Sequence, residues 1–211
     1  MIVPTTPAPA PLAARGVAAR AALLKAAAEE LAETGEVEVA AVARRAGVSA
    51  GLPYRYFGTR DGLLVAVVDD FHRRLADAVV FAPIEADTWA EREHERLRRW
   101  VAFLYADPLS SVVLGGVGDG EVAAAGARRL RDAVAVGGRN MAAAQATGEI
   151  DADRDPELLA AAVLGGVHTT VTLALGRRRR PRAERVVDEL WRFIAGAVGL
   201  VHDDPVGGGR R

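Results

Sequence analysis

The stretch ARRAGVSAGLPYRYFGTRDGLL, residues 43–64, decides the fold that the sequence predicts. It places an Ala-Gly-Val-Ser turn between two short segments with helical spacing of apolar residues. Gly47 permits the positive φ of a sharp corner, Val48 can fill the angle between the helices, and Ser49 can cap the second helix. This pattern predicts a helix-turn-helix, whose second helix enters the major groove of DNA.

Local charge agrees with DNA binding, although the whole chain has a formal net charge of −1. Between residues 44 and 60 the only charged side chains are those of Arg44, Arg45, Arg55 and Arg60. Tyrosines at 54 and 56 alternate with these arginines and can donate hydrogen bonds to phosphates. A solvated basic face is the plain alternative, and the turn motif favours DNA contact over it.

The rest of the chain predicts helices. Apolar stripes recur at Leu24, Ala27 and Leu31, at Leu64, Val67, Val68, Phe71 and Leu75, at Leu97, Trp100, Val101 and Leu104, at Leu159, Val163 and Val167, and at Val187, Leu190, Ile194, Ala197 and Val201. Gly35 is a stop signal, whereas Thr59 and Asp155-Pro156 are start signals. Residues 112–150 are helical by composition, with interruptions at glycine clusters.

Composition supports an all-α fold of 211 residues, since half of them are hydrophobic, mostly Ala, Leu and Val, and only 5% are aromatic. The chain has no cysteine, which excludes disulfides and thiolate metal sites. The N-terminus does not resemble a secretory signal, and the apolar run 158–167 is shorter than a membrane span, so a cytoplasmic protein is expected.

The run quoted above, together with RAALLKAAAEELAETG at residues 20–35, resembles the TetR family of bacterial transcription regulators. The resemblance covers residues 15–75. It implies a homodimer of all-helical subunits, each with a three-helix DNA-binding head and a larger domain for effector binding and dimerisation. We therefore expect a tail at 1–14, the head at 15–60, the larger domain at 61–203 and a tail at 204–211.

By position, the resemblance assigns the DNA-binding residues. The recognition helix would carry Ser49, Ala50, Gly51, Leu52, Tyr54 and Arg55, and phosphate contacts would come from Tyr54, Tyr56 and Arg60. Arg55 is the candidate for base readout, because arginine can bond guanine in a bidentate way. The chain departs from the family at Glu38, in place of a Thr cap, at Pro53 within the recognition helix, and at Tyr56, in place of the commoner His.

The function implied is that of a sequence-specific regulator, most simply a repressor that a small molecule releases from a pseudo-palindromic operator. The last two helices, 155–176 and 181–201, would form the dimer contact.

A further prediction places an effector pocket at Trp100, Phe103, Leu104, Tyr105, Met141, Gln145 and His168. His168 is alternatively a core histidine. A nonspecific architectural DNA binder and a small helical enzyme are the other classes, and no arrangement of nucleophile and base favours the enzyme.

Several further motifs are interpreted as structural. The arginines at 177–180 predict a solvated turn, and residues 116–120, GVGDG, predict a turn without a preceding strand. The aspartates at 151, 153 and 155 imitate a calcium loop, but Pro156 and Ala162 stand where that loop needs Gly and Glu. His72, His94 and His202 lack metal-binding spacing. No metal or cofactor is predicted.

Overall fold

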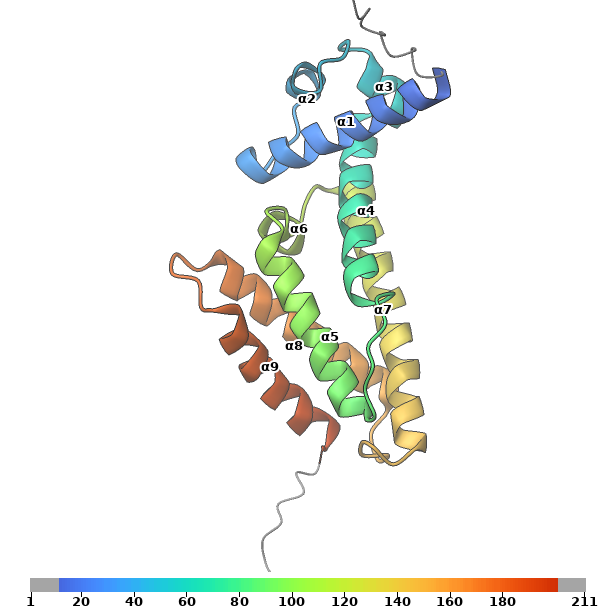
Figure 1. Ribbon diagram of the computed structural model, residues 1–211, viewed down its shortest axis with the longest axis vertical. Helices are drawn as coiled ribbons and strands as arrows, with labels where there is room; N and C mark the ends of the chain where they lie inside the picture. The colour runs from blue at the N-terminus through green and yellow to red at the C-terminus, as the bar shows by residue number, and fades with distance from the viewer. Residues whose placement is uncertain (1–11, 201–211) are drawn as a thin grey trace, which may run out of the picture. The chain divides into compact units, whose positions relative to one another are not determined.

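The computed structural model describes residues 12–200, and these form nine helices and no strand (Figure 1). The predicted all-α fold is confirmed. The predicted tail 204–211 and residues 1–11 of the N-terminal tail lie outside the described residues, whereas residues 12–14 belong to the first helix. The helices are α1 Leu12–Thr34, α2 Val39–Arg45, α3 Leu52–Phe57, α4 Arg60–Val79, α5 Trp89–Ala106, α6 Ser110–Gly115, α7 Gly120–Ala146, α8 Pro156–Gly176 and α9 Ala183–Val198.

Helix ends follow local signals. Gly35 ends α1 with φ +78°, and the Thr59 hydroxyl accepts a hydrogen bond of 2.9 Å from the Gly62 amide at the start of α4. The Asp155 carboxylate caps α8 by accepting from the amides of Glu157 and Leu158. These three signals are confirmed. A complete capping box at the start of α5, between Thr88 and Glu91, was not predicted.

Contacts divide the chain into two units. The first holds the described residues up to Arg73 and the segment Gly116–Ala124, and the second holds Arg74–Gly115 and the described residues from Ala125 onward. The predicted domain boundary at residue 60 stays a prediction. The predicted GVGDG turn is the loop before α7, with positive φ at Gly116 and Gly118.

The core of the first unit lies where α1, α2 and α3 pack together. Leu23, Ala27 and Leu31 of α1 are buried, as is Val42 of α2. Leu24, which the sequence stripe included, is only half-buried, and its neighbour Leu23 takes the central place. The buried residues of α1 therefore follow the spacing i, i+4, i+8. The buried face begins one residue earlier than the predicted face.

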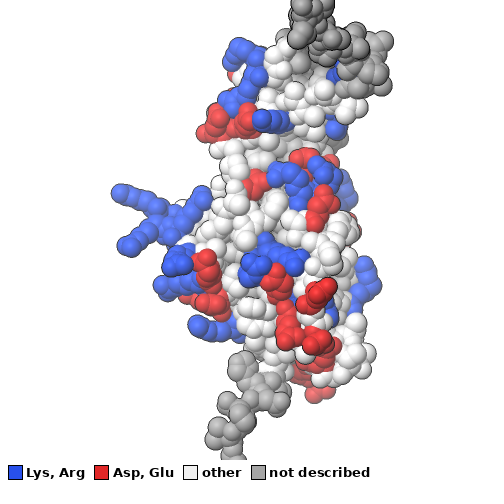
Figure 2. Space-filling view, viewed as in Figure 1, with Lys and Arg blue, Asp and Glu red and all other residues white. Residues whose placement is uncertain are grey.

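In the second unit α9 packs on α5 and α8, and α6 packs on α8. Val101, Val171 and Leu190 are fully or almost fully buried there. Asp107, just after α5, pairs with Arg74 and accepts from the amide of Leu109 at 2.9 Å. On the face shown in Figure 2, basic and acidic side chains are interspersed, in keeping with the near-zero net charge.

Among the described residues one helix, α8, is long and apolar enough to cross a membrane by length and composition alone. The apolar run 158–167 is only a part of this helix, which has 21 residues and agrees with the helix predicted over 155–176. The core helix of a soluble protein meets the same criterion. Here α8 packs against α6 and α9, and its exposed side includes the polar His168, Thr169 and Thr170.

Candidate DNA-binding site

The corner between α2 and α3 is built by a glycine in the left-handed region. Gly47 has φ +68°; its amide donates to the Arg44 carbonyl at 3.2 Å, and the Val48 amide donates to the Ala43 carbonyl at 3.0 Å. These two bonds form a Schellman motif, which satisfies carbonyls at the end of α2. The predicted role of Gly47 is confirmed, and this turn sets the direction in which the chain leaves α2.

The start of α3 differs from the prediction. The helix begins at Leu52, with Gly51 at the N-cap position and no side-chain cap. Ser49 contributes its backbone carbonyl, which accepts from the Leu52 amide at 3.0 Å, so the prediction that its side chain caps the helix is wrong. Ser49, Ala50 and Gly51 form the exposed turn that leads into α3.

Two departures from the family pattern behave as the sequence indicated. Glu38 occupies the N-cap of α2 without a side-chain capping bond. Pro53 lies in the first turn of α3 and is buried, at a position where its missing N–H costs the helix little.

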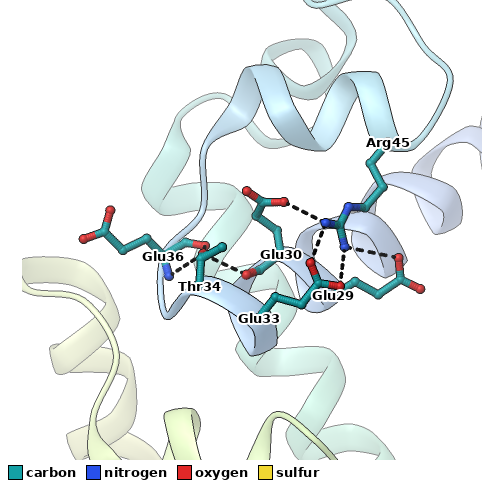
Figure 3. A network of polar contacts seen from close by, with 6 residues as sticks. All are labelled: Glu29, Glu30, Glu33, Thr34, Glu36 and Arg45. Carbon is teal, nitrogen blue, oxygen red and sulfur yellow. Dashed lines mark hydrogen bonds and ion pairs between the residues drawn. The ribbon is translucent and has the colours of Figure 1, made fainter.

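Arg45 faces α1 and is surrounded by carboxylates of that helix (Figure 3). Its guanidinium donates to both carboxylate oxygens of Glu33, at 3.0 and 2.7 Å, and lies 3.2 Å from Glu30 and 3.8 Å from Glu29. The hydrogen bonds from Arg45 lower the pKa of Glu33, and the same bonds raise the pKa of Arg45. Arg45 therefore links α2 to α1, and its positive charge is already balanced.

Tyr56 and Arg60 are also engaged within the first unit. The Tyr56 hydroxyl donates to the Gly16 carbonyl of α1 at 3.0 Å, and Arg60 Nε donates to the Val37 carbonyl at 2.8 Å. Arg60 also lies 3.7 Å from Asp61. Both side chains thus hold the ends of α3 and α4 against the segment formed by α1 and the loop after it.

Arg44, Tyr54 and Arg55 are exposed, and they differ from these three because no hydrogen bond or ion pair engages their side chains within residues 12–200. Tyr54 has 53% of its surface exposed, and Leu52 beside it is half-buried. Within residues 12–200, no ion pair or side-chain hydrogen bond engages Arg44 or Arg55. The uncompensated positive charge of the helix-turn-helix is therefore concentrated at these two arginines.

Two further residues support the recognition helix and were not predicted. Arg20 of α1 places its guanidinium carbon 5.3 Å from the centre of the Phe57 ring. Gly62 lies so close to the end of α3 that a Cβ there would be 2.1 Å from the Phe57 carbonyl oxygen. The sequence holds no local signal for either contact, because both depend on how separate segments pack.

Only two of the predicted effector-pocket residues border the cavity found in the second unit. Leu104 and Tyr105 border a cavity of about 250 Å³. Gln145 instead donates to the carbonyls of Asp151 and Arg154 and so fixes the turn before α8. Met141 is buried, Trp100 and Phe103 are half-buried, and none of the three borders that cavity.

His168 is exposed on α8. It is therefore not a core histidine, and that alternative is wrong for the single chain. His168 does not border the cavity next to Tyr105, and its place in an effector pocket stays a prediction.

Sequence comparison identifies the head. Residues 23–67 match the profile described as "Bacterial regulatory proteins, tetR family". The HTH-type transcriptional regulator BetI of Cronobacter sakazakii is 50% identical over 44 residues. That match covers 21% of this chain and 22% of the relative, so the chain aligns with about a fifth of this curated protein.

Structural comparison covers most of the chain. A protein from Rhodococcus sp., assigned to the TetR family of transcriptional regulators, is 25% identical with a TM-score of 0.62, over 86% of this chain and 99% of that one. SmeT, the repressor of a Stenotrophomonas maltophilia multidrug efflux pump, is 20% identical with a TM-score of 0.71, over 90% and 94%. Residues 23–67 therefore match the head of the TetR family of bacterial regulatory proteins, and the all-helical fold of the described residues is similar to that of a solved protein assigned to this family.

Proposed function

We propose that this chain acts as a homodimeric, sequence-specific DNA-binding regulator, most simply a cytoplasmic repressor released by a small molecule. The proposal rests on two exposed arginines of the helix-turn-helix, Arg44 and Arg55, which have no ion-pair partner in the part of the chain that the structure describes and lie beside the exposed Tyr54. In a chain of net charge −1, a localised positive surface at this helix-turn-helix corner favours contact between the corner and the phosphates of DNA.

The contacts divide the predicted DNA-binding residues by role. We assign base readout to Arg55 and phosphate binding to Arg44 and Tyr54, because no ion pair or hydrogen bond among the described residues engages these side chains. Tyr56 has one hydroxyl proton and donates it to Gly16, so a phosphate contact there would require that bond to break. We therefore assign Arg45, Tyr56 and Arg60 chiefly to positioning the recognition helix.

A dimer through α8 and α9 is supported by what these helices leave exposed. Leu158 and Leu173 of α8 are 71% and 59% exposed, and Phe193 of α9 is 44% exposed. Small residues, among them Ala161 and Gly165, are also exposed on α8 and would let a partner helix approach closely. A second copy meeting this face would form a four-helix bundle across a two-fold axis.

Regulation is proposed as a population shift. An effector bound in the second unit would favour a dimer in which the two recognition helices no longer fit successive major grooves. Operator DNA would then weaken effector binding by the same factor by which the effector weakens DNA binding.

Selection of binding sites from random duplex DNA, with the purified full chain at about 150 mM salt, tests the proposal. We expect enrichment of an inverted repeat whose half-sites are about one helical turn apart. Protein unfolded and refolded to remove bound ligand serves as the control. Failure to enrich any sequence with both preparations would contradict sequence-specific binding.

A further inference from the structure

The cavity of the second unit lies where α5 ends and the chain turns into α6, next to the end of α8. Its volume is about 250 Å³, suited to a small molecule and too small for a long-chain compound. Apolar walls come from Leu104, Pro108 and Leu175, and polar groups come from Tyr105, Asp107, Ser111 and Arg180.

The hydroxyl of Tyr105 is the first group without a partner at this cavity. It is buried and has no hydrogen-bond partner in the part of the chain that the structure describes. Buried polar atoms are rarely left unpaired, so this hydroxyl marks a place where a bound group completes the bonding. Burial raises the pKa of Tyr105, which keeps the phenol protonated and able to donate at neutral pH.

Arg180 supplies the second group. Its Nε donates to the Leu175 carbonyl at 2.9 Å, which anchors the guanidinium beside the end of α8. No carboxylate among the described residues forms an ion pair with Arg180, yet its positive charge acts on Tyr105 and opposes the rise in that pKa. Asp107, which also borders the cavity, forms an ion pair with Arg74.

Arg180 therefore brings to the cavity a positive charge that no ion pair within residues 12–200 balances. The neighbouring Arg177, Arg178 and Arg179 are exposed, and basic side chains project from the α8–α9 turn in Figure 2, which adds to the positive potential around Arg180.

We propose that this cavity binds a small carboxylic acid, with the carboxylate between Tyr105 Oη and the Arg180 guanidinium and the apolar body against Leu104, Pro108 and Leu175. The inference rests on the proposed function, because it names the chemical class of the effector. A guanidinium and a phenol proton are both donors, so together they select an anionic acceptor over a neutral group of similar shape.

Calorimetric titration of the full-length protein tests this site, with benzoate as the probe and benzyl alcohol as its neutral counterpart. We expect saturable binding of one benzoate per chain and about tenfold weaker binding of benzyl alcohol. Arg180→Gln should weaken benzoate binding about tenfold or more, whereas Arg179→Gln, a change in the same exposed run, should leave it unchanged.

Tyr105→Phe gives a second readout. Because the variant removes a buried unpaired hydroxyl and keeps the ring, it should raise the thermal midpoint of the free protein and reduce the shift that benzoate produces. Absence of saturable benzoate binding, or equal binding by the wild type and Arg180→Gln, would overturn the inference. Equal losses in Arg179→Gln and Arg180→Gln would also overturn it, by showing general charge attraction.

DNA binding distinguishes this inference from the proposed function. If benzoate binds as described but leaves affinity for a selected DNA site unchanged, the cavity assignment stands and release by an effector is wrong. If the protein binds a selected site and benzoate does not bind, the regulator stands and the carboxylate site is wrong.

Discussion

At the residue scale, the arginines of the helix-turn-helix have different roles that the sequence does not distinguish. Arg44 and Arg45 are adjacent and both exposed, yet Arg44 has no ion-pair partner among the described residues and Arg45 forms ion pairs with Glu29, Glu30 and Glu33. The sequence showed that no acidic residue lies between 44 and 60, but the balancing carboxylates come from α1, twelve or more positions earlier. A count of charges along a short stretch of sequence misses these partners, because they approach Arg45 only when α1 and α2 pack together.

Arg55→Ala should weaken binding to the preferred DNA site by about 1–3 kcal/mol and relax the preference at one base pair, because it removes a bidentate base contact. Fluorescence anisotropy with the selected duplex and its single-base variants measures this. Arg44→Ala is the matched control. It should weaken binding to all DNA sequences alike and reduce by about one the slope of log affinity against log salt concentration. Uniform weakening by Arg55→Ala would reassign Arg55 to phosphate.

Glu95 gives a pH-dependent prediction within the second unit. Hydrogen bonds from Arg98 and Arg99 lower its pKa from 4.5 to about 2, so its carboxylate stabilises the folded state fully above pH 4.5. This contribution is lost as pH falls from 4.5 toward 2. Thermal midpoints of wild type and Glu95→Gln should therefore differ at pH 6 and converge near pH 2. A difference that grows on acidification would contradict the assignment.

At the element scale, the sequence predicts best where a helix end depends on one or two neighbouring residues. Gly35, Thr59 and Asp155 were recognised correctly because stop and cap signals are local. Ser49 was misassigned because a cap residue also favours tight turns, and here the turn extends to Gly51 before α3 begins. The capping box of Thr88 and Glu91 is also a local signal, although the sequence prediction does not include it.

Gly47→Ala should lower the free energy of unfolding by about 1–2 kcal/mol, because an alanine at φ +68° is forced into the left-handed region. Chemical denaturation monitored by circular dichroism measures the change. Gly51→Ala is the matched control, since Gly51 has φ −81° and no atom within 4 Å of an added Cβ. Equal destabilisation by both substitutions would show that the turn does not depend on a left-handed residue.

At the scale of the whole molecule, α8 and α9 expose large apolar side chains that packing within the single chain does not cover. The sequence predicted both helices and their apolar stripes, but it could not separate the side that packs internally from the side that faces outward. His168 illustrates this, since α8 is so rich in apolar residues that its faces look alike in the sequence. The packing of α6, α7 and α9 against α8 distinguishes them.

Phe193→Glu should convert the proposed dimer to a monomer, because it places a charge in an apolar interface. Size-exclusion chromatography with light scattering at micromolar concentration measures the mass. Phe81→Glu is the matched control, because Phe81 is a more exposed aromatic residue, 74% against 44%, and lies outside both helices. A monomeric wild type, or a Phe193→Glu variant that stays dimeric, would contradict the interface.

The most direct measurement of the central claim is the ratio of affinities for the selected inverted repeat and for a scrambled duplex of the same composition. Both are titrated with ligand-free protein at about 150 mM salt. A sequence-specific regulator should bind the repeat at least about 10³-fold more tightly. A ratio near one, with affinity governed by salt alone, would contradict the account and indicate a nonspecific DNA-binding protein.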